Sequence, residues 1–161
     1  MRKMAVLVLV LAFPNLAMVP QGTNNPAGDK AAIEKAVLDA HARMTRAGNS
    51  LDADAFFAFI LDSDKGSIIQ DGKLLKTRAE ALGIVKAGFQ GVAKADRQYD
   101  GTYVTVLSQE AALLVASGSS TVTLGDGRTF NGPFAVSLLF VLRDGQWKVL
   151  HGHYSVPNGP S

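Results

Sequence analysis

The stretch RDGQWKVLHGHYSVP, residues 143–157, decides the fold, because it joins a tight-turn dipeptide to a strand-like pattern. Asp144-Gly145 readily takes the positive φ angles of a two-residue β-hairpin loop. Side chains then alternate between the two faces of the strand that follows. A hairpin centred on this turn puts Trp147, His151 and His153 on one face, each opposite an apolar residue of the preceding strand.

A second hairpin is predicted at Asp126-Gly127, which has the same turn chemistry. Pairing the two strands around this dipeptide sets Ser117 opposite Val136, on the same face as the two histidines. A bulge near residues 131–133 would shift the pairing by one residue and move Ser117 to the opposite face. We therefore predict that Ser117 faces the helices, with the bulge as the alternative.

The rest of the pattern places helices first and strands last. Helical spacing of apolar residues predicts a helix over 30–47, a short aromatic helix over 52–61, and a third helix from the TRAE capping box at Thr77 through Phe89. A small hairpin is predicted around Asp71-Gly72. Period-two patterns then predict long strands at about 98–107, 111–124, 128–143 and 146–156. The fold class is α+β, with three N-terminal helices packed on a strongly curved antiparallel sheet.

The third histidine of the chain belongs to the first helix. His41 continues the spacing of Ile33 and Val37 and is followed by Met44, so we expect it to face the sheet. A single inward imidazole is often just a hydrogen-bonded core residue. Three of them on facing layers need polar partners, which a pocket holding water or a ligand would supply.

Metal binding is the obvious alternative for these histidines. A His-x-His strand faced by a third histidine has the donor types of a catalytic zinc site. The spacing of His151 and His153 is by itself a weak signal for a metal site, however, and no carboxylate can be assigned to orient the rings. We predict neither a metal nor a cofactor. The sequence also has no cysteine nucleophile, no G-x-S-x-G elbow and no phosphate-binding Walker loop.

The N-terminus has the layout of a secretory leader. Arg2 and Lys3 precede an apolar run, residues 4–13, that is shorter than the roughly 20 residues of a membrane-spanning helix. We predict a signal peptide at 1–22, a flexible tether at 23–29, the folded domain at 30–157 and a tail at 158–161. A buried N-terminal helix is the alternative for the first segment. The prediction implies an exported protein, periplasmic or extracellular, without a permanent membrane anchor.

Charge gives no indication of a nucleic-acid partner. The chain has 16 basic and 14 acidic residues, and removing Arg2 and Lys3 of the leader from the 16 leaves 14, equal to the acidic count. The remaining Lys and Arg are scattered along the sequence rather than clustered on one segment.

The order of these elements, ending in DGQWKVLHGHYSVP, resembles the nuclear transport factor 2-like superfamily over roughly residues 30–157. Its SnoaL-like members, and the association domain of calmodulin-dependent kinase II, often end in a similar pattern, which Trp147, His151 and His153 match. The resemblance implies a cone-shaped roll with a pocket at its open end, and frequently a homodimer made through the outer sheet face. Ketosteroid isomerases and polyketide cyclases in the superfamily imply proton transfer next to a carbonyl, but Asp71 lies in a plain turn here and His41 stands near the position of the isomerase oxyanion tyrosine.

Three functions follow as hypotheses. The first is an exported pocket protein that binds a small apolar molecule with a polar end, with unproven catalysis. Its candidate pocket residues are His41, Ser117, Trp147, His151 and His153. The second is a non-catalytic dimerisation module with structural histidines. The third is an isomerase or cyclase acting next to a carbonyl.

Overall fold

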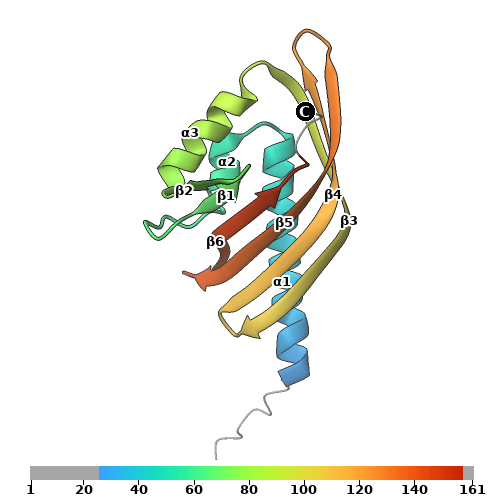
Figure 1. Cartoon of the computed structure of the whole chain (residues 1–161). Helices are drawn as coiled ribbons and strands as arrows, with labels where there is room; N and C mark the ends of the chain where they lie inside the picture. The colour runs from blue at the N-terminus through green and yellow to red at the C-terminus, as the bar shows by residue number, and fades with distance from the viewer. Residues whose placement is uncertain (1–25, 158–161) are drawn as a thin grey trace, which may run out of the picture.

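The first helix carries a buried stripe that holds it against the sheet. In the computed structural model, which describes residues 26–157, helix α1 spans Pro26–Asn49 and begins four residues before the predicted start. Val37, His41 and Met44 are buried at the expected spacing. Figure 1 shows the sheet curving around the helices, which lie on one face. The predicted signal peptide, the first residues of the tether and the tail lie outside the described residues.

The second helix is much shorter than predicted, whereas the third agrees. Helix α2 is only Ala53–Phe57, and its first turn is capped by Asp52, whose Oδ1 accepts a hydrogen bond from the Ala55 amide at 2.9 Å. Helix α3 is Arg78–Phe89, capped by Thr77 as the TRAE motif predicts. The α+β class is confirmed, but only two of the three predicted helices are long.

Among residues 26–157 the sheet has six strands, in the order β2-β1-β6-β5-β4-β3. It is mixed rather than purely antiparallel, because the short strand β1 runs parallel to β6. The face covered by the helices is called the inner face below, and the opposite one the outer face. The strands are β1 Ile68–Gln70, β2 Lys73–Leu75, β3 Val92–Ser108, β4 Ala111–Leu124, β5 Thr129–Arg143 and β6 Gln146–Ser155.

The β4–β5 turn differs from the prediction by one residue. Its loop has three residues, Gly125 to Gly127, closed by a hydrogen bond from the Leu124 amide to the Arg128 carbonyl at 2.8 Å. Gly127 takes a φ of +88°, which suits the left-handed position of such a loop. The longer loop shifts the register, so that Ala116 rather than Ser117 pairs with Val136. Ser117 therefore lies on the outer face, and its predicted inward placement is wrong.

A bulge in β6 reverses the predicted direction of the last two histidines. The pairing of Leu142 with Trp147 and of Phe140 with Val149 is as predicted. The register then shifts, leaving Leu150 as an extra residue, and Leu139 pairs with His151. The bulge occurs where β6 changes its neighbour on the side away from β5. The Val149 amide donates a hydrogen bond to the Phe59 carbonyl, whereas from Gly152 on β6 pairs with β1.

The predicted inward placement of His151 and His153 is consequently wrong. His153 is exposed on the outer face and His151 is half-buried. Gly152 and Tyr154 take the inner positions instead, and Gly152 is buried.

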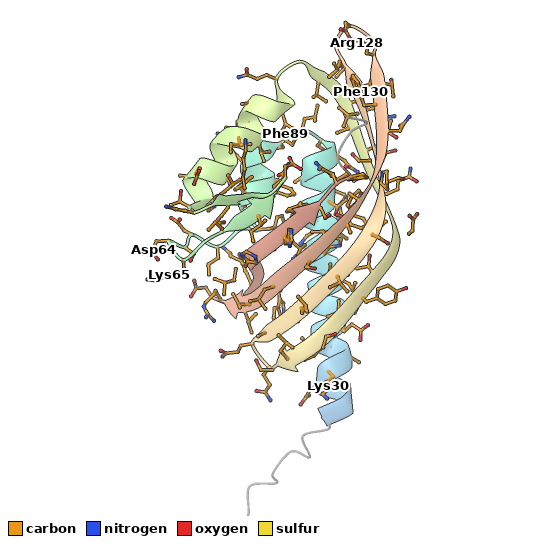
Figure 2. All side chains as sticks on the ribbon, in the orientation of Figure 1. Lys30, Asp64, Lys65, Phe89, Arg128 and Phe130 are labelled. Carbon is orange, nitrogen blue, oxygen red and sulfur yellow. The ribbon has the colours of Figure 1, made fainter. Side chains whose placement is uncertain are left out.

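Large apolar side chains fill the space between the helices and the inner face. Each contributes about 1.5–3 kcal/mol by leaving water. The β4–β5 hairpin extends past this core, with Arg128 and Phe130 near its tip (Figure 2). The largest fully buried side chains are Phe57, Phe140, Met44, Leu114, Leu138, Val37 and Val149.

Candidate ligand-binding cavity

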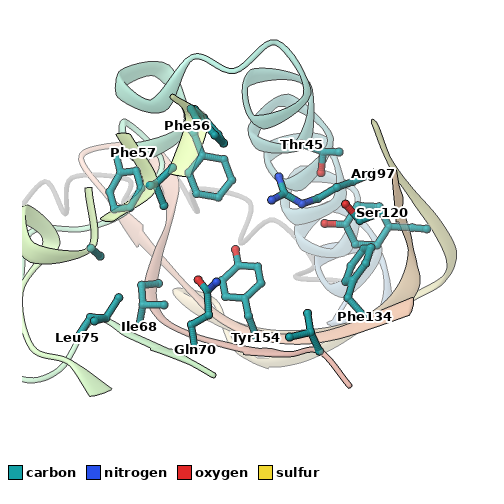
Figure 3. A pocket seen from close by; sticks show the side chains of 15 residues that line it. Thr45, Phe56, Phe57, Ile68, Gln70, Leu75, Arg97, Ser120, Phe134 and Tyr154 are labelled. Carbon is teal, nitrogen blue, oxygen red and sulfur yellow. The ribbon is translucent and has the colours of Figure 1, made fainter. Parts of the chain in front are cut away.

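A cavity of about 140 Å³ lies between the helices, the β1–β2 hairpin and the inner face of the sheet (Figure 3). Side chains from α1, α2, α3 and all six strands surround it, so it forms only in the folded domain. Most of its wall is apolar, and Val156, 49% exposed, stands where the wall meets solvent. The apolar wall consists of Phe56, Phe57, Ile68, Leu75, Ala81, Val85, Phe89, Phe134 and Val156.

Polar groups face the same cavity from different elements. Figure 3 shows the Arg97 guanidinium, the Tyr154 phenol and the Gln70 amide directed toward its interior. Thr45 Oγ1 is buried and makes no well-aligned hydrogen bond with the described residues. A site with apolar walls and a few converging hydrogen-bonding groups is typical of a small-molecule site. The polar lining residues are Thr45, Gln70, Arg97, Tyr99, Ser120 and Tyr154.

The end of α1 positions Arg97. The Asn49 side chain accepts a hydrogen bond from the Arg97 amide at 3.0 Å and donates one to the Arg97 carbonyl at 3.3 Å. Gly48, buried one residue earlier, leaves room for the guanidinium, because a Cβ there would lie 3.0 Å from Arg97 Nη1. Helix α1 and strand β3 are thus joined at the residue that brings a positive charge to the cavity.

The two tyrosines are neutral hydrogen-bond donors. Burial raises the pKa of Tyr154 well above its usual range, and the Arg97 charge acts in the opposite direction. Burial likewise raises the pKa of Tyr99, against smaller effects from Thr45 and Arg97. Both phenols therefore keep their protons at neutral pH and can donate to an oxygen atom of a ligand.

Replacing Asn49 by alanine is expected to destabilise the domain by about 1–3 kcal/mol, because two partly buried backbone groups of Arg97 lose their partner. Urea unfolding monitored by circular dichroism measures the change. Asn131→Ala is the control, because Asn131 makes only an exposed bond to Thr121, and it should alter stability by less than about 0.5 kcal/mol. Equal effects of the two substitutions would contradict the role given to Asn49.

The five residues predicted as a pocket do not surround one cavity. His41 is buried on the inner side as expected, but its ring packs edge-on against Tyr99, 4.6 Å between centroids, behind the cavity wall. Trp147 faces the helices and lines a separate surface hollow with Arg43 and Phe59. Ser117 and His153 lie together in a shallow groove on the outer face. A cavity lies between the helices and the sheet, but none of these five residues lines it.

Arg97 and Tyr154 are functional candidates that the sequence pattern did not identify. Tyr154 follows His153 directly, so recognising the bulge at Leu150 would have found it. Arg97 has no local sequence signal, because its direction depends on Asn49, 48 residues away.

The same geometry rules out a zinc site built from the three histidines. His151 and His153 lie on the outer side of the sheet and His41 on the inner side, so one ion cannot reach all three. Among residues 26–157, no cluster of three His, Cys, Asp or Glu side chains has the arrangement of a metal site. Within the same range, no helix has the length and apolar character needed to cross a membrane.

The curved sheet, the helices on one face and the cavity between them define an α+β protein of the nuclear transport factor 2-like type. The SnoaL-like domain family matches residues 37–159, and the chain belongs to it. The resemblance drawn from the closing motif is thus confirmed. No curated protein matches the chain.

Solved structures share the fold at low sequence identity. A candidate dehydratase of the nuclear transport factor 2-like family from Streptomyces avermitilis has a TM-score of 0.70 and 17% identity, over 81% of this chain and 99% of that one. A candidate scytalone dehydratase from Novosphingobium aromaticivorans has a TM-score of 0.74 and 10% identity, over 82% and 89% of the two chains. A type 2 hexachlorocyclohexane dehydrochlorinase has a TM-score of 0.69 and 13% identity, over 82% and 90%. These similarities show the fold alone.

Proposed function

We propose that the protein binds a small apolar molecule with a polar end in the cavity between the helices and the inner face. The observation that carries the proposal is the combination of an apolar wall with polar groups that converge from several elements. A neutral phenol, Tyr154, and an amide, Gln70, supply hydrogen bonds to the polar end. The apolar part of the ligand packs against aromatic side chains such as Phe134 and Phe57.

The volume limits the ligand to about one ring. A cavity near 150 Å³ holds a molecule of the size of benzene, and this one is about 140 Å³. Since Val156 at the rim is half exposed, a substituent can extend toward solvent. Structural neighbours include candidate dehydratases and a dehydrochlorinase. The cavity-lining residues that the structure describes include no carboxylate and no imidazole, so the proposal is one of binding and assigns no reaction.

Filling the cavity should abolish binding. Val85 on α3 lines the cavity, whereas its neighbour Ile84 is 48% exposed and does not. Val85→Phe is expected to remove binding of single-ring compounds seen in ligand-observed NMR, and Ile84→Phe to leave it intact. Wild-type protein that binds no single-ring compound, or a Val85→Phe variant that binds as well as Ile84→Phe, would overturn the proposal.

The outer face favours a second function, self-association. Tyr103 and Val115 pair across β3 and β4 and are 69% and 38% exposed. Around them the groove carries small, uncharged residues, Ser117, Ala135 and Ser137. Exposed apolar side chains among small uncharged residues are typical of a protein interface. We propose that a second copy of the chain covers this face in a homodimer.

A charged side chain introduced into the outer face tests the proposed dimer. Tyr103→Asp should convert a dimer in light scattering after size exclusion into a monomer, whereas Phe130→Asp, at an exposed site on the β4–β5 hairpin, should not. Wild-type protein that is monomeric at micromolar concentration would contradict the proposal.

Export is proposed from the leader pattern of residues 1–22 alone. N-terminal sequencing of protein from the periplasm or medium of an expressing bacterium should find a mature chain that begins near residue 23. Full-length protein confined to the cytoplasm would contradict it.

A further inference from the structure

We propose that the cavity selects molecules that carry a carboxylate, with Arg97 as the residue that binds the anion. The inference rests on the proposed function, since it names the polar end of the ligand that the cavity takes. Three observations support it: the guanidinium has no partner in the described residues, hydrogen-bond donors lie around it, and these groups line one cavity.

The Arg97 side chain has no partner among residues 26–157. Its backbone is held by Asn49, but its guanidinium makes neither an ion pair nor a hydrogen bond in the described part of the chain. Arg78 gives the contrast, because its guanidinium donates hydrogen bonds to the carbonyls of Phe57 and Ile60 at 2.8–3.1 Å. Arg78 is therefore structural, whereas Arg97 retains its full donor capacity.

The groups around Arg97 favour a negatively charged ligand. Among residues 26–157 no carboxylate lines the cavity, and the other polar groups that face it are hydroxyls, phenols and one amide. Burial raises the pKa of Tyr99 and of Tyr154, the Arg97 charge opposes this rise in both, and all three side chains line the cavity. A cation among apolar walls is stabilised by an anion that replaces lost water.

A carboxylate fits this donor set better than a neutral group. Its two oxygens can accept two parallel N–H bonds from a guanidinium, and a remaining lone pair can accept from a phenol such as Tyr154. Hydrogen bonds to charged groups are worth more than neutral ones. In a single ring that bears a short acid, such as phenylacetate, the ring matches the volume and the acid matches the charge.

The test compares phenylacetate with phenylacetamide, which has the same shape but no charge, by isothermal titration calorimetry at neutral pH. Wild-type protein should bind the acid at least about tenfold more tightly than the amide. Arg97→Gln should lose this preference while still binding the amide. Arg46→Gln, which removes an exposed positive charge from the same end of α1, should keep the preference.

The outcomes separate the two proposals. Equal wild-type affinities for the acid and the amide would overturn the carboxylate inference and leave the cavity proposal standing. A preference that survives Arg97→Gln as well as it survives Arg46→Gln would overturn the role of Arg97. If wild-type protein binds neither compound, both proposals fall. Because the wild-type comparison needs no variant, a poorly folded Arg97→Gln does not prevent the test.

Discussion

Gly118→Ala should cost the domain at least about 3 kcal/mol, because the added methyl group meets the backbone rather than a side chain that can move. A Cβ at Gly118 would lie 1.9 Å from the Gln98 carbonyl oxygen and 2.9 Å from the Tyr99 Cα. The register of β3 shifts between Tyr99 and Gly101, and this bulge brings β3 against Gly118. Strands β3 and β4 would have to separate to admit the methyl group.

Gly132→Ala is the matched control. Gly132 lies on β5, where it pairs with Ser120 of β4, and a Cβ there would meet nothing within 4 Å. Urea unfolding of both variants measures the difference. If the free energies of unfolding of Gly118→Ala and Gly132→Ala agree within about 0.5 kcal/mol, the close approach of β3 to Gly118 is contradicted.

The same substitution should weaken ligand binding. Gly118 lies between Tyr99 on β3 and Phe134 on β5, whose rings meet edge-to-face with centroids 5.2 Å apart. Both rings line the cavity, and Arg97 is two residues from Tyr99. A displaced β3 therefore moves the wall and the proposed anion-binding group together.

Features with a local cause could be predicted from the sequence. Asp71-Gly72 and Asp144-Gly145 form their turns with positive φ at both residues, as their chemistry requires. Thr77 caps α3, and the stripe that includes His41 packs against the sheet. In each case the decisive residues lie within a few positions of one another, so a short segment contains the information.

The site could not be predicted because it depends on register. One extra residue in the loop at 125–127 and one extra residue at Leu150 each reverse which side chains face inward. Leu150 has no distinctive local mark, since it stands between Val149 and His151 in an ordinary strand pattern. The idea that the closing strand contributes to the cavity is retained, but Tyr154 makes the contribution instead of His153.

His41 should make the stability of the domain depend on pH below neutrality. Burial lowers its pKa from 6.5 to about 4, and its buried Nε2 has no hydrogen-bond partner in the described residues. Tyr99, whose ring packs against it, is neutral throughout this range. Because the folded-state pKa is depressed, the unfolded chain binds the proton first. The full stability is present above pH 6.5 and is lost as the pH falls toward 4, by up to about 3 kcal/mol.

His41→Leu isolates this effect, since it replaces the imidazole with an apolar side chain that has no polar atom to satisfy. In urea unfolding between pH 4 and 7, the free energy of unfolding should fall less on acidification for His41→Leu than for the wild type. Above pH 6.5 the two proteins should show the same dependence on pH. His153→Gln, at an exposed histidine, should retain the wild-type slope. Contributions from carboxylates are common to all three proteins and cancel in the comparison. A His41→Leu profile parallel to that of the wild type would contradict the lowered pKa that burial gives the imidazole.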